Sequence, residues 1–295
     1  MADVIAIIAQ GEMGAAVGHR LHDGGARVIT SLAGRSAASA ARAKAAGFVA
    51  VDSDDELASQ ADFILSIVPP GDAVALAERL RPALKKVTGK PIYMDCNAVA
   101  PETAERIGAI IAETGCRYVD AGIIGGPPKA NAPGPKFYVS GEAAKEAERL
   151  SAYGLTIRIV DGPLAAASAL KMSYAGITKG LTAIGAAMIL GAARAGCAEA
   201  LHKEMGESLP QTLAWLSKQI PKMYPKAYRW VAEMEEISAF LDADPAGHDI
   251  YQGVARFYEH LAQEFAQSGD KAEELELLTR FCSEMEKAST VRKSA

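Results

Sequence analysis

The 295-residue sequence has few cysteines and no large excess of charge of either sign. Its four cysteines, Cys96, Cys116, Cys197 and Cys282, are far apart and form no Cys-x-x-Cys pair. This spacing argues against a disulfide framework or a zinc site and is typical of reduced thiols in a cytoplasmic protein. The 31 Lys and Arg against 36 Asp and Glu give a formal charge of −5 without a long basic run, so we expect no nucleic-acid or anionic-membrane partner.

The sequence also lacks signals for export, for membrane insertion and for two common hydrolase sites. Residues 1–10 have the pattern of a short buried strand rather than of a signal peptide. The most apolar region, residues 164–201, is interrupted by Lys171, Lys179 and Arg194, so we expect a helix buried in protein instead of a membrane span. His-Glu-x-x-His and Gly-x-Ser-x-Gly motifs are absent, so we predict neither a metal site nor a serine nucleophile.

The first half of the chain alternates short apolar runs with helix-length, Ala-rich segments. Strands separated by helices are typical of βαβ units, which form a mostly parallel sheet. The chain is also long enough for two domains of roughly 150 residues. The runs that we predict as strands are residues 4–9, 27–32, 48–51, 62–68, 92–95, 117–120, 137–139 and 156–160.

After Gly162-Pro163 no convincing strand pattern follows, and the remainder has the pattern of helices. We predict an α/β Rossmann-type N-terminal domain, residues 1–162, and an all-α C-terminal domain, residues 163–295, for substrate binding and dimerisation. Phe257, Leu261 and Phe265 recur every four residues and form an amphipathic stripe. Helices this apolar often pack across a subunit interface, so we expect a homodimer formed through the C-terminal helices.

The first apolar run leads into a glycine turn and then into an Ala-rich helix. The turn, Ala9-Gln10-Gly11-Glu12-Met13-Gly14, is the dinucleotide fingerprint with its first glycine replaced by alanine. Gly11 allows the backbone to approach a pyrophosphate, Gly14 allows the helix to pack on the strand, and the helix N-terminus attracts the phosphate charge. We predict that Gln10 to Gly14 bind a dinucleotide; the alternative is a purely structural glycine turn.

The end of the second apolar run indicates which nicotinamide cofactor is bound. NAD-specific sites usually carry Asp or Glu there to accept the ribose 2′-hydroxyl, whereas this sequence has Ser31-Leu32-Ala33-Gly34-Arg35-Ser36. Arg35 can form paired hydrogen bonds with a 2′-phosphate, and Ser31 and Ser36 can donate to it. We therefore predict NADP as the cofactor, with NADPH preferred over NADH. The alternative is that Arg35 is a solvated residue at the start of a helix.

Lys171 is the candidate acid or base because it lies in a nearly charge-free segment, residues 164–185. Burial of an amine lowers its pKa and makes it a usable proton donor or acceptor near neutral pH. The alternative is a lysine that extends to the surface or pairs with an acid.

Four segments of the sequence occur together in one known superfamily. They are Val68-Pro69-Pro70, Asp95-Cys96-Asn97, residues 120–126 and the segment around Lys171. Their order and approximate spacing resemble the β-hydroxyacid dehydrogenases, which include 3-hydroxyisobutyrate and 6-phosphogluconate dehydrogenases. Residues 171–180 look like the catalytic helix of the latter, and residues 229–237 resemble a small C-terminal domain of unknown function found in one branch. The resemblance covers most of the chain.

This resemblance implies a role for each matching segment. A cofactor would lie along Gly11 and Gly14, with Val68, Pro69, Pro70 and Asn97 on its nicotinamide side. Ile124, Gly125, Gly126 and Ala175 would line the substrate pocket. Lys171 would exchange a proton with the substrate oxygen while hydride moves to or from the nicotinamide. The resemblance thus implies an NADPH-dependent oxidoreductase that acts on a carbonyl or hydroxyl group.

The sequence departs from the superfamily pattern at several polar positions, among them Lys179, which stands where 6-phosphogluconate dehydrogenase has a phosphate-binding Tyr. Ala175 stands where the superfamily usually has Asn, and Ile124 stands where it has the Ser before Gly-Gly. Thr178 replaces the Glu of 6-phosphogluconate dehydrogenase, which makes oxidative decarboxylation unexpected. These changes suggest a bulkier or more apolar substrate than a short hydroxyacid. Tyr174 is a candidate to assist proton transfer, with ordinary packing as its alternative role. An imine reductase and a non-catalytic NADPH-binding sensor are the competing functions.

Overall fold

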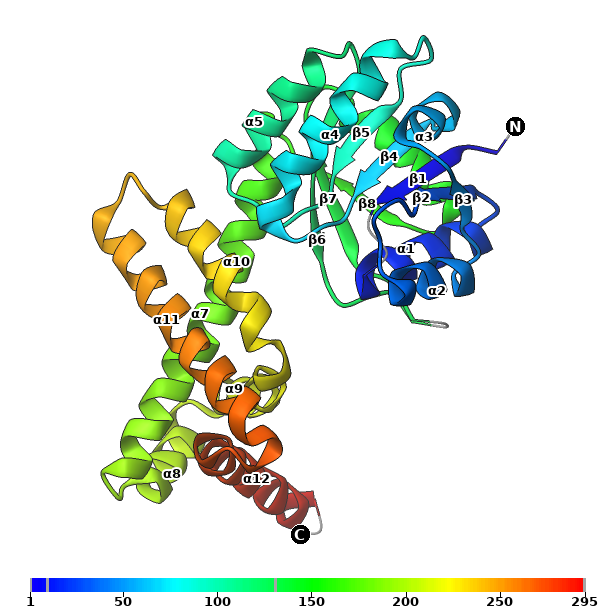
Figure 1. Cartoon of the computed structure of the whole chain (residues 1–295). Coiled ribbons are helices and arrows are strands. Elements are labelled where there is room, and N and C mark those ends of the chain that lie inside the picture. Colours follow the sequence, from blue (N-terminus) through cyan, green and yellow to red (C-terminus); the bar gives the residue numbers. More distant parts are fainter. Residues whose placement is uncertain (1, 9–10, 130–131, 294–295) are drawn as a thin grey trace. The chain divides into compact units, whose positions relative to one another are not determined.

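The computed structural model describes residues 2–8, 11–129 and 132–293, with side chains described up to Ser283. The chain forms two compact units, Met1–Met172 and Ser173–Ala295 (Figure 1). The sequence suggests a division in the loop at residue 162, whereas the units divide farther on, inside a long helix. The first turns of that helix belong to the N-terminal unit because they are hydrogen-bonded to its sheet.

An eight-stranded sheet forms the centre of the N-terminal unit, with the strand order β3-β2-β1-β4-β5-β6-β7-β8. Strands β1 to β6 run parallel, β7 is antiparallel to β6, and β8 is parallel to β7. This confirms the predicted mostly parallel, Rossmann-like sheet. The strands are β1 (Val4–Ile8), β2 (Arg27–Ser31), β3 (Val49–Val51), β4 (Phe63–Ser66), β5 (Ile92–Asp95), β6 (Arg117–Ile124), β7 (Lys136–Ser140) and β8 (Thr156–Ile159).

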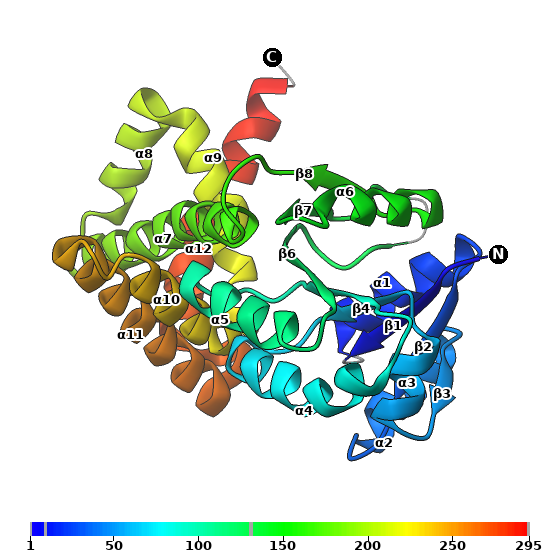
Figure 2. The ribbon, with the colours of Figure 1, turned by 90° about the horizontal axis from the view of Figure 1, so that it is seen from above.

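Helices cover both faces of this sheet (Figure 2). α3, α4 and α5 pack on one face, and α1, α6 and the 3₁₀ helix η2 pack on the other. Because Ile5 and Ile7 point to one face and Ala6 and Ile8 to the other, β1 is apolar throughout instead of alternating. The helices are α1 (Glu12–Asp23), α2 (Ala37–Ala45), α3 (Asp54–Gln60), η1 (Pro70–Asp72), α4 (Ala73–Lys86), α5 (Pro101–Ala112), α6 (Ala144–Ala147) and η2 (Glu148–Tyr153).

Strand β6 extends beyond the predicted residues 117–120 and ends at Ile124. The added residues pair with the antiparallel strand β7, in the register Asp120 to Ser140 and Ile124 to Lys136. The sequence pattern misses this extension because Asp120 and Gly122 interrupt the apolar run. Both residues are nevertheless buried, since each one meets the long helix that follows β8.

Every regular element described after β8 is helical, which confirms the predicted helical C-terminal region. Within the C-terminal unit α10 and α11 pack together, and Tyr258 and Leu261 of α11 are fully buried. The helices are α7 (Ala166–Arg194), α8 (Ala198–Ser208), α9 (Pro210–Gln219), η3 (Ile220–Lys222), η4 (Tyr224–Lys226), α10 (Ala227–Phe240), α11 (Pro245–Ser268), η5 (Gly269–Lys271) and α12 (Glu273–Lys293).

Helix α7 is the one described helix with the length and apolar composition of a membrane span. Its two internal lysines are both used in contacts within the protein. Lys171 donates to the carbonyl oxygen of Ile123, and Lys179 pairs with Glu233 and lies 5.1 Å from the centre of the Trp230 ring. Both lysines thus contact protein, but only 44% of the apolar window of α7 is buried, so the expectation of a fully buried helix is wrong for one face of it.

Candidate functional site

The predicted site residues of the N-terminal unit gather at one edge of the sheet. Gly11 follows β1, Ser31 ends β2, Val68 follows β4, Asn97 follows β5, and Ile124 ends β6. Because the carboxyl ends of parallel strands share one edge, these five positions from distant parts of the sequence lie along that edge. In open α/β sheets this edge is where ligands bind, at the point where the strand order reverses, which here lies between β1 and β4.

The glycine turn after β1 presents an open helix N-terminus. Gly11 precedes the first turn of α1, with φ −71° and ψ −176°, and a Cβ atom there would meet no other atom within 4 Å. Glu12 is exposed in the first turn, Met13 is partly buried and Gly14 is buried. The N-terminus of α1 and the space beside Gly11, which no described atom fills, fit a pyrophosphate. Gln10, also predicted here, lies outside the described residues.

The close approach of α1 to its surroundings depends on a glycine that the motif did not single out. A Cβ atom at Gly18 would lie 2.1 Å from the Phe48 ring, well inside van der Waals contact. Gly18 therefore lets Phe48, which follows α2, pack directly on the backbone of α1.

The end of β2 carries a cation and a second helix N-terminus, and no acid. Ser31 is buried, Arg35 is partly buried, and Ser36 is the N-cap of α2, where its side chain accepts a hydrogen bond from the Ser39 N–H at 3.2 Å. The backbone N–H of Arg35 bonds to the Leu32 carbonyl at 3.0 Å, which closes the turn. An arginine beside an exposed helix N-terminus suits a phosphate better than a ribose hydroxyl.

Asn97 holds the turn after β4. Its Oδ1 accepts from the Val68 N–H at 2.6 Å, and its Nδ2 donates to the Ser66 hydroxyl at 2.8 Å and to Asp95. The side chain is 3% exposed, so these bonds take up its polar atoms inside the protein. Asn97 thus fixes the turn Val68-Pro69-Pro70 at the predicted nicotinamide side, with Pro69 exposed and Pro70 starting η1.

Lys171 reaches the same edge from helix α7. Its Nζ donates a hydrogen bond of 2.8 Å to the carbonyl oxygen of Ile123, next to the end of β6. Burial lowers the pKa of Lys171 to about 8, because the charged amine loses its hydration. The helix can come this close because a Cβ atom at Gly122 would lie 2.9 Å from both the Lys171 Cβ and the Ala167 carbonyl oxygen.

The predicted substrate residues fall into two groups. Ile124 is partly buried, and Gly125 and Gly126 are exposed at the start of the β6–β7 loop. Gly125 has φ +129°, a conformation that favours glycine. Ala175 and Tyr174 belong to the C-terminal unit, where Ala175 is buried and Tyr174 is 50% exposed. The structure therefore places Lys171 against Ile123, the residue before Ile124, within one unit.

Sequence reasoning missed the polar residues that hold the start of α7. Asp120 accepts hydrogen bonds from the Ser168 N–H at 2.8 Å and the Ser168 hydroxyl at 2.6 Å, and Ser140 accepts one from the Ala167 N–H at 2.9 Å. The sequence signal that could have revealed them is an Asp inside an otherwise apolar strand. Burial raises the pKa of Asp120 and raises that of its in-register neighbour Asp95 to about 7.

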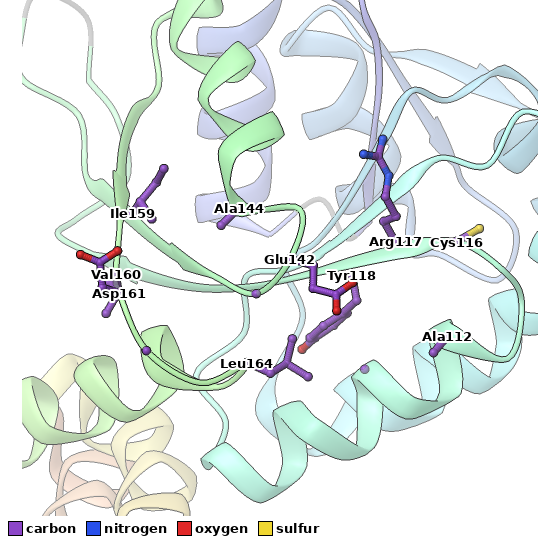
Figure 3. A pocket seen from close by; sticks show the side chains of 13 residues that line it. Ala112, Cys116, Arg117, Tyr118, Glu142, Ala144, Ile159, Val160, Asp161 and Leu164 are labelled. Atoms are coloured by element: carbon purple, nitrogen blue, oxygen red, sulfur yellow. The ribbon is translucent and has the colours of Figure 1, made fainter.

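A cavity of about 690 Å³ lies elsewhere in the same unit, at the amino end of β6 (Figure 3). Tyr118, Glu142 and Leu164 line it together with Arg117, whose guanidinium pairs with Glu146. None of the predicted cofactor or acid–base residues lines this cavity. The case for a ligand site at the carboxyl edge rests on the polar groups and helix N-termini described above.

Two families match the chain. The NAD binding domain of 6-phosphogluconate dehydrogenase matches residues 4–153, and a domain of unknown function, DUF1932, matches residues 192–261. The first match covers the sheet and the glycine turn. The second lies within the helical region, where the sequence already suggested such a domain.

Individual relatives agree with these families. The 3-hydroxyisobutyrate dehydrogenase of Pseudomonas aeruginosa is 34% identical over 98 residues, which are 33% of each chain. The chain spans only 33% to 58% of the length of the curated relatives it matches. A solved protein of unknown function, described as similar to 3-hydroxyacid dehydrogenases, is 27% identical with a TM-score of 0.70, over 88% of this chain and 97% of that one.

A further solved structure shows the same fold. The 3-hydroxyisobutyrate dehydrogenase of Mycobacterium tuberculosis, determined with L-serine, has a TM-score of 0.74 and 19% identity over 94% of this chain and 98% of that one. At that identity the likeness concerns the fold alone.

Proposed function

The chain belongs to the family of the NAD-binding domain of 6-phosphogluconate dehydrogenase, and from this premise we propose that it is an NADPH-dependent oxidoreductase with Lys171 as its acid–base group. The observation that carries the proposal is the position of the Lys171 amine, 2.8 Å from the Ile123 carbonyl oxygen at the carboxyl edge of the sheet. A titratable amine is thereby held at the edge where the family binds its dinucleotide.

The chemistry of Lys171 follows from its environment. Bound NADPH would supply a hydride to the carbonyl carbon of the substrate. As charge develops on the carbonyl oxygen, the Lys171 ammonium donates its proton to that oxygen, and the product is an alcohol. A pKa of about 8 leaves the amine mostly protonated at neutral pH and able to give up a proton readily. In the oxidative direction the neutral amine takes the same proton.

NADPH is proposed over NADH because of the residues at the end of β2. Arg35 and the N-terminus of α2 at Ser36 offer positive charge and hydrogen-bond donors where an acid would be needed for NADH. A 2′-phosphate carries the negative charge that this arrangement favours.

The substrate is proposed to be a carbonyl compound with an apolar group next to the reacting carbon. Ile124 lies beside the Lys171 contact and offers only an aliphatic side chain to a ligand. A branched aliphatic chain favours burial of apolar substrate surface over a bond to a carboxylate. Oxo compounds with bulky apolar substituents are therefore the first class to test.

The acid–base role is tested with Lys171→Met in a panel of such oxo compounds. We expect NADPH binding within about twofold of the wild type and a loss of turnover of about 10² to 10⁴-fold. The matched control is Lys203→Met, which removes an exposed lysine on α8 and should leave turnover unchanged. Wild-type turnover in Lys171→Met would reject the role. NADPH binding without turnover in the wild type would instead favour a non-catalytic sensor, and turnover of C=N compounds alone would favour an imine reductase.

A further inference from the structure

The first turn of α7 is held by side chains from two strands of the sheet. The Ala167 and Ser168 N–H groups lie at the start of the helix, where no carbonyl of the helix can accept their hydrogen bonds. Ser140 of β7 accepts the first at 2.9 Å, and Asp120 of β6 accepts the second at 2.8 Å. Asp120 therefore acts as a cap supplied by the sheet.

Asp120 and Ser140 also bond to other groups at this point. The Ser168 hydroxyl donates to Asp120 Oδ1 at 2.6 Å. The Ser140 hydroxyl lies 2.7 Å from the Leu164 carbonyl oxygen and 3.1 Å from Asp120 Oδ2, and can donate to either. Both side chains are 1% exposed, so water does not compete for these bonds. The entry into α7 is thus held at residues 167 and 168, and the Leu164 carbonyl oxygen lies within hydrogen-bond distance of Ser140.

Lys171 follows these anchors by one helical turn. Residues three and four apart lie on the same side of a helix, so Lys171 extends over β6 on the side that Ala167 and Ser168 anchor. Its Cβ packs against Gly122 and its amine reaches the Ile123 carbonyl. Strand β6 therefore contacts α7 through Asp120, Gly122 and Ile123. The contact at Ile123 is the one made by the Lys171 amine.

We propose that Asp120 is the positioning residue for Lys171: by capping the first turn of α7 it holds the amine at the Ile123 carbonyl and out of water. This inference rests on the proposed role of Lys171 for its catalytic meaning, while the positioning itself is a property of the folded protein. Asp120 touches neither the amine nor the predicted cofactor residues.

The alternative is a direct electrostatic effect of the Asp120 carboxylate on Lys171, and the two mechanisms predict shifts of opposite sign. If Asp120 acts by position, its loss frees the first turn, the amine gains water, and the pKa of Lys171 rises from about 8 towards 10.5. If it acts by charge, removal of a nearby anion lowers the pKa of the amine further. Burial is the cause of the present shift, which favours the first mechanism.

The test is the reactivity of Lys171 towards trace acetic anhydride, measured by mass spectrometry over a pH series in Asp120→Asn and in the wild type. Complete release of the amine would reduce its labelling at pH 8 by about 100-fold, because far less of it would be deprotonated. Asp62→Asn is the matched control, since Asp62 caps the Val4 N–H at 2.8 Å far from α7 in the sheet. An unchanged or lowered pKa of Lys171 in folded Asp120→Asn overturns the proposal.

A second pair of variants covers the case in which Asp120→Asn does not fold. Ser168→Ala removes one donor and Ser140→Ala removes the acceptor of the Ala167 N–H, and each should raise the pKa of Lys171 in the same direction but less. No shift in either folded variant also overturns the proposal. The labelling needs no substrate, so a shifted pKa together with full turnover in Lys171→Met would retain the positioning and reject the catalytic role.

Discussion

At the scale of single residues, the site could be predicted where a residue type has one dominant use. Gly11 and Arg35 were predicted as cofactor residues because a glycine turn after a strand and a missing acid have direct chemical meanings, and they follow β1 and β2 in the structure. Asn97 was placed correctly along the edge, but its amide holds the Val68 turn. Whether an amide faces a ligand or the protein depends on neighbours such as Ser66, which is far away in the sequence.

The buried pair of carboxylates on β5 and β6 was invisible as a pair in the sequence. Asp95 and Asp120 are in register on neighbouring strands. Asp120 accepts two hydrogen bonds from Ser168, which favour its charged form, whereas Oδ2 of Asp95 is buried and accepts none among the described residues. Burial and the nearby Asp120 raise the pKa of Asp95 to about 7.

We predict that Asp95→Asn stabilises the protein increasingly as the pH rises. The pKa of Asp95 is higher in the folded state than its usual 3.8. Between about pH 4 and 7 the folded state therefore binds the proton that the unfolded chain has lost, and wild-type stability falls as the pH rises. The Asn variant has no carboxyl to titrate at this position. Its free energy of unfolding relative to the wild type should therefore grow by up to about 1.4 kcal/mol per pH unit and level off above pH 7. Urea denaturation over a pH series measures it; a pH-independent difference would contradict the raised pKa.

At the scale of elements, apolar runs were sufficient to locate all eight strands but not the full length of β6. The added residues of β6 are defined by pairing with β7, a contact between distant segments that no local pattern contains. The position of α7 depends in the same way on a close approach. Its backbone lies against Gly122, a residue that looks like an interruption in the sequence.

We predict that Gly122→Ala weakens the contact between β6 and α7. The new methyl group would lie 2.9 Å from the Ala167 carbonyl oxygen, so the helix must shift. Overpacking of this kind costs about 1–3 kcal/mol in free energy of unfolding. The shifted helix should also expose the Lys171 amine and raise its pKa, which lowers its acylation at pH 8 relative to the wild type. Gly126→Ala is the control, because a Cβ there meets no atom within 4 Å. Equal free energies of unfolding for the two variants would show that the structure accommodates the methyl group at position 122 without strain, and would contradict the prediction.

At the scale of the whole molecule, the C-terminal unit leaves one face of α7 uncovered. Five large side chains at intervals of three and four residues are each at least 50% exposed: Tyr174, Ile177, Leu181, Ile184 and Met188. This spacing is that of a coiled-coil seam, which pairs with another helix of the same pattern. A second copy of α7 offers that pattern, and we therefore propose the expected homodimer through this stripe.

The dimer is tested with a double substitution, Ile177→Lys and Leu181→Lys, which places charge in the stripe. Light scattering after size-exclusion chromatography should give the mass of two chains for the wild type and of one chain for the variant. The control is the double variant Glu199→Lys and Lys203→Glu, which changes two exposed residues of α8 outside the stripe. A monomeric wild type, or a dimeric double variant, would contradict the proposed interface.

The measurement that tests the central claim most directly is a fluorescence titration of the purified protein with NADPH and with NADH, alongside Arg35→Ala. Arg27→Ala, at the opposite end of β2, is the control. We predict saturable NADPH binding, at least tenfold weaker NADH binding, and loss of that preference in Arg35→Ala alone, because the 2′-phosphate loses its cation. A preference for NADH would contradict the role of Arg35, and binding of neither nucleotide would contradict the proposed oxidoreductase.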